Sequence, residues 1–313
     1  MPSIPEVPHG RTSRRLEWQF LPPHIRRVVE SHCGSPVVST ESQGGGFTPG
    51  FASVLTCADG TRHFVKAAST QAQRPFADSY REEARKLELL PDSVPAAQLL
   101  WLHDDDWVVL GLEYVEGRAP RRPWRADELD RCLDAVEEMS RSLTPAPPAM
   151  GLDSFADEFA GFVAGWDHVR ATRPDLPHLA DAAALAAGFA EVTSGTTLVH
   201  TDLRDDNLIL GADGTVWMCD WNWPVVGAAW LDTLFVLIQP RGDGIDVDAL
   251  LAERPLTRDV PPEHVDAALA LVCGYFLKQR DEPVPPTSPY LRRHQSWCAE
   301  VTWDWLTDRR GWR

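Results

Sequence analysis

The sequence predicts an α+β fold with two lobes: a five-stranded antiparallel N-terminal lobe and a mainly helical C-terminal lobe. Short segments with the composition of β-strands lie within residues 37–112, and glycine-rich or acidic turns or a single helix separate them. From Arg118 onward, apolar residues recur at helical spacing. A chain of 313 residues is long enough for one large domain or for two lobes with a real core.

The first part of the chain predicts one helix and then three strands. The helix is expected near residues 23–32. The glycine-rich segment 43–50 separates the first two strands, and Ala58-Asp59-Gly60 is a turn signal between the second and the third. The strands are expected at residues 37–40, 51–56 and 63–67.

A second helix follows these strands. Tyr80, Ala84, Leu87 and Leu90 recur at spacings of four, three and three, which is the period of an amphipathic helix, and Pro91 ends it. Two further strands complete the predicted sheet, at residues 98–102 and 107–112.

Three apolar stripes then predict helices of the second lobe. A short β patch interrupts them before further helices begin. The stripes cover 129–143, 155–166 and the Ala-rich segment 179–192, the β patch covers 198–210 with 216–218, and the later helices lie near 229–238, 262–277 and 289–305. A ligand is expected in the cleft between the two lobes.

The charge balance narrows the class of partner. With 30 basic and 46 acidic side chains, the formal net charge is -16, which argues against nucleic acid or an anionic membrane as the main partner. An acidic surface suits a cationic small substrate, but it is also a common means of staying soluble. Both interpretations remain open.

The cysteines and the apolar segments predict a cytoplasmic protein. Six cysteines lie scattered without a C-x-x-C pair, so we expect reduced, mostly buried thiols, and their spacing does not support a zinc site. The N-terminal residues offer no apolar stretch typical of a signal peptide. The longest apolar run, Ala267–Leu277, is about half of the ~20 residues that a membrane span needs.

The residues with the clearest chemistry lie in one segment of the β patch. Apolar strands flank the polar loop from His200 to Asn207, and Asp220 follows Asn207 by thirteen residues at the end of another strand. The turn 211–214 would join the two β pieces into a hairpin, which places the loop and Asp220 at the same end. A carboxylate that takes a proton from a hydroxyl, together with an amide and a second carboxylate that hold Mg²⁺, is the set that phosphoryl transfer needs. Turn residues of a surface hairpin are the alternative, but this alternative leaves the upstream pattern unexplained.

This segment resembles a known catalytic loop. Residues 200–207 match H-x-D-L-x-x-x-N of protein kinases, with Thr201 where those enzymes carry Arg. Asp220 stands where the magnesium Asp of D-F-G would be, followed by Trp221 and Asn222. The chain is therefore similar to the aminoglycoside phosphotransferase and choline kinase family, a branch of the protein-kinase-like fold. The resemblance spans roughly residues 37–238.

The resemblance implies roles in the loop. Asp202 would be the catalytic base, and Asn207 and Asp220 would be ligands of Mg²⁺. His200 would orient the loop, and Asp232 would support it from a helix.

Arg204 has two interpretations. It lies two residues after Asp202, where kinases carry a lysine that touches the transferred phosphoryl group. Alternatively, it forms a surface ion pair with Asp205 or Asp206.

The resemblance also implies a nucleotide site in the first lobe. Gly44, Gly45 and Gly46 would cover the phosphates, although this segment could equally be a flexible turn. Lys66 on the third strand would contact phosphate, where a solvated strand lysine is the alternative. Glu83, on the same helix face as Tyr80 and Leu87, is the expected partner of Lys66 rather than Glu82.

The expected domain boundaries follow. Residues 1–112 would form the nucleotide-binding lobe, residues 113–117 the hinge, and residues 118–313 the helical lobe with the catalytic loop and the acceptor pocket. The backbone at Glu113 and Val115 would bind the base of the nucleotide. The segment 150–195 and the C-terminal helices, which carry no motif, would form the acceptor pocket.

The predicted function is a small-molecule kinase. It would transfer the γ-phosphoryl group of ATP or GTP, with Mg²⁺, to a hydroxyl of a cationic acceptor such as an aminoglycoside-type antibiotic or an amino alcohol. Only 12 residues separate Asp220 from Asp232, which is too few for the activation loop of a protein kinase. The rival interpretation is a catalytically silent nucleotide-binding protein. Four tryptophans near the predicted metal site are either packing residues or an aromatic wall for the acceptor: Trp217, Trp221, Trp223 and Trp230.

Overall fold

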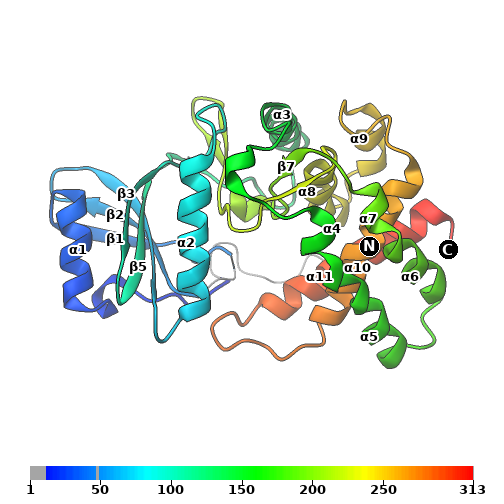
Figure 1. The fold of residues 1–313 in the computed structure, drawn as a ribbon, viewed down its shortest axis with the longest axis horizontal. Coiled ribbons are helices and arrows are strands. Elements are labelled where there is room, and N and C mark those ends of the chain that lie inside the picture. The colour runs from blue at the N-terminus through cyan, green and yellow to red at the C-terminus, as the bar shows by residue number, and fades with distance from the viewer. Residues whose placement is uncertain (1–11, 47–48, 313) are drawn as a thin grey trace.

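The N-terminal lobe contains a five-stranded sheet (Figure 1). The computed structural model describes residues 12–46 and 49–312. The strand order of this sheet is β1-β2-β3-β5-β4, and every neighbouring pair is antiparallel, as the sequence predicted. The elements of this lobe are η1 (Trp18–Phe20), α1 (Pro23–Cys33), β1 (Val37–Ser42), β2 (Phe51–Cys57), β3 (Arg62–Ser69), α2 (Arg74–Leu89), β4 (Leu99–Asp104) and β5 (Trp107–Glu113).

The two long helices of this lobe cover opposite faces of the sheet. Successive strand residues point to opposite faces. Val65 and Ala67 accordingly pack with Ile25 and Val29 of α1, whereas Ala68 packs with Tyr80 of α2. In Figure 1 the sheet lies between α1 and α2. Lys66 shares the face of Ala68, which is the face covered by α2.

The remaining elements form the mainly helical lobe. They are β6 (Gly117–Arg118), α3 (Ala126–Ser142), η2 (Pro148–Met150), α4 (Phe155–Glu158), η3 (Ala160–Ala164), α5 (Gly165–Thr172), α6 (Leu179–Ala187), α7 (Phe189–Val192), β7 (Thr197–Val199), η4 (Asp205–Asn207), β8 (Leu208–Gly211), β9 (Val216–Met218), β10 (Val225–Gly227), α8 (Leu231–Gly242), α9 (Val247–Glu253), α10 (Pro262–Gln279) and α11 (Leu291–Arg310). No helix in residues 12–46 and 49–312 has both the length and the apolar character that crossing a membrane requires.

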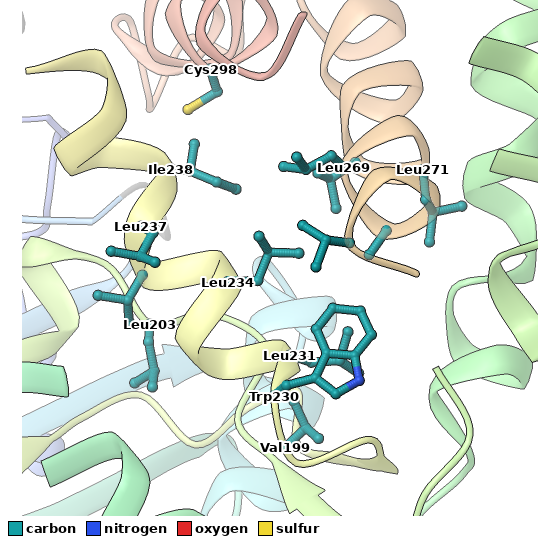
Figure 2. Packing of buried hydrophobic residues seen from close by; sticks show 14 of the residues in the cluster. Val199, Leu203, Trp230, Leu231, Leu234, Leu237, Ile238, Leu269, Leu271 and Cys298 are labelled. Atoms are coloured by element: carbon teal, nitrogen blue, oxygen red, sulfur yellow. The ribbon is translucent and has the colours of Figure 1, made fainter. Parts of the chain in front are cut away.

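The core of this lobe supports the segment with the predicted catalytic loop. Helix α10 packs against α5, α6 and α11. Figure 2 shows Leu234 and Leu237 of α8 directed between Leu203 of the loop and Leu269 of α10. All four side chains are at most 1% exposed. The loop is therefore anchored to the apolar core of this lobe through Leu203.

Two predicted helices are interrupted. The stripe 155–166 divides into α4, η3 and α5, and the Ala-rich stripe 179–192 divides at Gly188 into α6 and α7. At the start of α5, a Cβ on Gly165 would lie 2.3 Å from the backbone oxygen of Gly274 in α10. The close approach of these two backbones requires glycine here, and apolar spacing alone does not reveal it.

Among the strands and α-helices, β6, α9 and β10 were not expected. Strand β10 pairs antiparallel with β7, and β6 pairs with β8, so each depends on contacts between distant segments. Helix α9 has a local signal, because the side chain of Asp246 caps its first turn by accepting from Ala249 N.

Candidate active site

The hairpin predicted from the sequence is present and brings the polar residues together. Strands β8 and β9 pair antiparallel, with Leu208 opposite Met218. Just beyond this pair, Cys219 N donates to the backbone oxygen of Asn207 at 2.9 Å. Asn207 and Asp220 therefore lie at the same end of the hairpin.

Asp232 holds the backbone of the loop. Its carboxylate accepts from His200 N at 2.7 Å and from Thr201 N at 2.9 Å. Thr201 has φ 70° and Asp220 has φ 69°, a left-handed conformation that is rare for residues other than glycine, and especially for a β-branched one. Burial raises the pKa of Asp232 to about 6, although the two N–H donors work against this shift. The two bonds from Asp232 fix the loop at its strained residue.

His200 is a neutral, buried link between the loop and the next strand. Burial lowers its pKa to about 4. Its Nε2 donates to the backbone oxygen of Cys219 at 3.1 Å, which leaves Nδ1 to accept from Asp202 N at 3.3 Å. Both ring nitrogens are engaged within the protein, so the imidazole orients the loop.

Asp202 is held by an amide and a guanidinium. Asn207 Nδ2 donates to the backbone oxygen of Asp202 at 2.7 Å and to its Oδ2 at 3.0 Å, and Arg204 Nη1 donates to Oδ1 at 2.6 Å. Burial raises the pKa of Asp202 to about 6, and the charge of Arg204 opposes the shift. The side chain keeps 30% of its surface exposed, so a ligand can reach it.

Arg204 lies between two carboxylates. Besides Asp202, it contacts Asp206, where Nε and Oδ1 are 2.9 Å apart. Asp205 accepts from Gln239 of α8 at 2.7 Å and lies 3.5 Å from Arg122. Of the two ion-pair partners considered from the sequence, the structure thus pairs Arg204 with Asp206.

Lys66 joins the two lobes. Its Nζ lies 2.7 Å and 2.9 Å from the two carboxylate oxygens of Glu83, and 2.9 Å from Asp220 Oδ1. Glu82, the rejected candidate, pairs with Arg85 on the surface. Although burial disfavours the ammonium charge, the carboxylates of Asp220 and Glu83 raise the pKa of Lys66 above its ordinary value. The same ammonium holds the pKa of Asp220 below its usual range, against the effect of burial.

A cavity of about 370 Å³ lies beside this cluster. Most of the residues predicted to contact nucleotide line it, and they come from both lobes. These residues are Gly45, Gly46, Lys66, Glu83, Glu113, Val115, Asn207 and Asp220. Gly44 is absent from the lining, and its backbone oxygen instead accepts from Thr12 N at 2.8 Å. Asp202 and Arg204 also lie outside the lining.

The predicted glycine-rich segment is described only in part. Phe47 and Thr48 lie outside the described residues, as does the N-terminal stretch that was searched for a signal peptide. Gly45 is held on one side, because Arg15 Nη2 donates to its backbone oxygen at 2.7 Å.

Three arginines on the cavity wall were missed from the sequence. Arg15, Arg62 and Arg118 all line the cavity, and Arg62 stacks 3.8 Å from the ring centre of Tyr114. Each lies in an ordinary polar stretch without a motif, so no local signal marks it. Cations on the wall would suit an anionic ligand.

The four tryptophans separate into packing and surface residues. Trp221 and Trp230 are buried, and Trp217 is half-buried, as packing residues would be. Trp223 is 56% exposed, and its backbone oxygen accepts from Thr201 Oγ1 at 2.8 Å. It is therefore an exposed ring attached to the predicted catalytic loop.

Comparison with known proteins agrees with this geometry. The profile of the phosphotransferase enzyme family matches residues 52–267. The structure is similar to aminoglycoside phosphotransferase APH(4)-Ia in complex with ADP and hygromycin B (12% identity, TM-score 0.62, 91% of this chain and 98% of that one). It is also similar to choline kinase LicA from Streptococcus pneumoniae (14%, 0.59, 90% and 99%) and to spectinomycin phosphotransferase APH(9)-Ia (9%, 0.64, 91% and 98%).

At these identities the structural matches establish the fold, and they confirm the two-lobed kinase-like architecture expected from the sequence. A search of curated proteins found no match.

Proposed function

The chain belongs to the phosphotransferase enzyme family, and on that premise we propose that it is a small-molecule kinase. The donor is ATP or GTP, and the acceptor is a hydroxyl group of a cationic small molecule, such as an aminoglycoside-type antibiotic or an amino alcohol. The observation that carries this proposal is the contact of Lys66 with both Glu83 and Asp220 at the wall of the cavity between the lobes.

The donor half of the proposal rests on the cavity. Its volume of about 370 Å³ lies in the range of small-molecule sites. We assign Gly45, Gly46 and Lys66 to the phosphates, with Glu83 holding Lys66 in position. The backbone of Glu113 and Val115 is assigned to the base, and Gly44 to the outer part of the loop. Two of the relatives above were solved with ADP, which supports a nucleotide donor here.

The donor atoms fit a magnesium ion. Asn207 uses Nδ2 to bind Asp202, so its amide oxygen remains as the metal ligand, and Asp220 adds a carboxylate. Oxygen ligands of this kind suit Mg²⁺. When bound, Mg²⁺ would neutralise charge on the phosphates of the nucleotide.

The acceptor half rests on Asp202. In this proposal its carboxylate accepts the proton of the acceptor hydroxyl and orients the oxygen for attack. Arg204 neutralises charge on the phosphoryl group as it leaves the donor. His200 and Asp232 keep the loop in place.

Three features favour a cationic acceptor. The chain carries a net charge of -16, Trp223 offers an exposed ring beside the loop, and two relatives were solved with hygromycin B and spectinomycin. We place the acceptor pocket between residues 150–195 and the C-terminal helices. We further propose the lobe boundaries 1–112 and 118–313 with the hinge 113–117, a cytoplasmic location, and no nucleic acid or membrane partner.

A nucleotide-consumption assay tests the proposal. The purified chain is incubated with Mg²⁺ and either ATP or GTP over a panel of aminoglycosides, amino alcohols and sugars. We expect acceptor-dependent consumption that the Asp202→Asn variant lacks. In parallel, Mg²⁺ with the correct nucleotide should raise the melting temperature, because a ligand of the folded state stabilises it by mass action.

The two measurements separate the alternatives. Thermal stabilisation without consumption over the whole panel would favour the catalytically silent nucleotide-binding protein. The absence of stabilisation by either nucleotide at millimolar concentration would contradict the proposal itself.

A further inference from the structure

Two cysteines and a histidine converge on the N-terminal lobe, away from the active site. The ligand atoms of Cys33, Cys57 and His63 all lie within 4.8 Å of one another. Cys33 ends α1, Cys57 ends β2, and His63 lies near the start of β3. Backbone bonds hold the two strand residues in register, because His63 pairs with Leu55 and Cys57 N donates to Thr61 O at 2.9 Å.

The histidine in this cluster lacks a hydrogen-bonding partner. Both ring nitrogens of His63 are buried, and neither has a hydrogen bond within the described part of the chain. Buried polar nitrogens are nearly always satisfied, because an unsatisfied one loses its hydration without compensation. The cysteines at its side are free thiols, and Cys57 is only 2% exposed. A bound ligand would therefore supply the interaction that the buried imidazole of His63 lacks.

We propose that Cys33, Cys57 and His63 bind a structural zinc ion. Thiolate and imidazole ligands favour Zn²⁺ and disfavour Mg²⁺, which prefers oxygen. A tetrahedral ion needs ligands a few ångströms apart, and these atoms meet that condition with a small adjustment of side chains.

The fourth ligand position has a candidate on α1. Glu30 lies three residues before Cys33 and therefore on the same face of the helix. Its Oε1 accepts from Val37 N at 3.1 Å, and Val37 pairs with Cys57 in the sheet. The second oxygen of Glu30, after a change of its side-chain rotamer, or a water molecule would complete the coordination, since Glu30 is not among the residues whose ligand atoms lie within 4.8 Å of one another.

The site would join α1 to the hairpin of β2 and β3. His63 shares the sheet face of Val65 and Ala67, which is covered by α1, whereas Lys66 points to the opposite face. The zinc ion would therefore stabilise the lobe without touching the reacting groups. The cysteine spacing contains no zinc motif because the three ligands come from separate segments, 24 and 6 residues apart.

The test uses the full chain after chelation and under a phosphine reductant. We expect one equivalent of Zn²⁺ to bind, to raise the melting temperature, and to release two protons, one from each thiol. Co²⁺ in place of Zn²⁺ should show the charge-transfer absorption of thiolate ligands. These measurements on the wild type do not depend on whether any variant folds.

Variants then identify the ligands. Zinc binding should weaken in each of three variants: Cys33→Ser, Cys57→Ser and His63→Gln. Loss of a residue that only contacts a ligand lowers metal affinity by about 10–100-fold, so loss of a ligand itself should lower it further. The matched control is His32→Gln: His32 is next to Cys33 on α1, but its ring stacks on Trp101, so binding should be unchanged. Circular dichroism of each variant checks that it remains folded.

Three results would overturn the proposal. One is wild-type protein that binds no zinc under reducing conditions. Another is a folded Cys33→Ser or Cys57→Ser variant that binds zinc as tightly as the wild type. The third is a Cys33–Cys57 disulfide, rather than bound metal, in the protein as purified from cells.

Discussion

Two charge clusters in the candidate active site have the same arrangement of charges but are built from different parts of the chain. In each, a cation lies between two carboxylates: Lys66 between Glu83 and Asp220, and Arg204 between Asp202 and Asp206. The partners of Lys66 lie 17 and 154 residues away, whereas those of Arg204 lie two residues to either side.

The two clusters also differ in exposure. The side chains of Lys66 and Glu83 are 10% and 2% exposed, whereas those of Arg204 and Asp202 are 24% and 30% exposed; in the Lys66 cluster only Asp220, at 29%, is as open. The Lys66 cluster therefore depends on the assembled fold and joins the lobes, while the Arg204 cluster is local and open. We expect changes in the Arg204 cluster to affect the chemical step, and changes in the Lys66 cluster to affect donor binding and the coupling of its members.

The largest expected effect tests this division at Asp202. Asp202→Asn keeps the shape of the side chain and removes the base, so turnover should fall by about 10²–10⁴-fold while nucleotide affinity stays near that of the wild type. Turnover and nucleotide affinity are measured with one accepted substrate. Asp220→Asn is the matched comparison, and it should weaken binding of the metal–nucleotide complex as well. If Asp202→Asn retains more than about a tenth of the wild-type rate, Asp202 is not the base.

A smaller effect is expected in the Lys66 cluster. If Glu83 acts on the nucleotide through Lys66, the losses of affinity in Lys66→Met and Glu83→Gln should not add, with a coupling of about 0.5–3 kcal/mol in a double-mutant cycle. Nucleotide titrations of the wild type, both single variants and the double variant give this coupling. Glu82→Gln, which changes a surface carboxylate one position away, should leave affinity unchanged. Additive losses, or a larger loss from Glu82→Gln, would place Lys66 and Glu83 in independent roles.

The smallest effect sharpens the role of Arg204. The pKa of Asp202 is raised to about 6, and only the ionised carboxylate accepts a proton, so kcat/KM should fall as the pH drops below about 6. Arg204→Gln removes a neighbouring positive charge and should move this acid limb to higher pH by about one unit, the low end of the effect of a nearby cation. A pH profile of each protein measures the shift, with Arg85→Gln as a surface control. An unmoved limb would show that Arg204 does not influence the ionisation of Asp202.

Within the long-range cluster, the pair of Lys66 and Glu83 was predicted from the sequence, whereas the contact of Lys66 with Asp220 was not. Glu83 could be chosen over Glu82 because helical periodicity identifies the inward face of α2, and the alternation of β3 places Lys66 on the face that α2 covers. The contact of Arg204 with Asp202 was not anticipated, since spacing within a loop does not specify how a long side chain folds back. The wall arginines Arg15 and Arg62 were missed for a related reason: surface cations carry no periodic signal.

In the fold, features set by local pattern were predictable, and contacts between distant segments were not. The antiparallel sheet and the β8–β9 hairpin follow from local alternation and turn residues, and these predictions are confirmed. The close backbone contact at the start of α5 joins Gly165 and Gly274, which are 109 residues apart and have no common local pattern. The pairing of β7 with β10 likewise becomes visible only when the chain is folded.

The support that Asp232 gives to the predicted catalytic loop has a consequence for how binding energy is used. Thr201 sits in a backbone conformation that costs about 1–3 kcal/mol, and the buried carboxylate of Asp232 holds it there by accepting hydrogen bonds from His200 N and Thr201 N. Because these contacts lie within the protein, the loop is ordered by folding rather than by a substrate. A preorganised loop needs no rearrangement at the moment of reaction, so the affinity of a substrate can be spent on alignment at the reacting atoms.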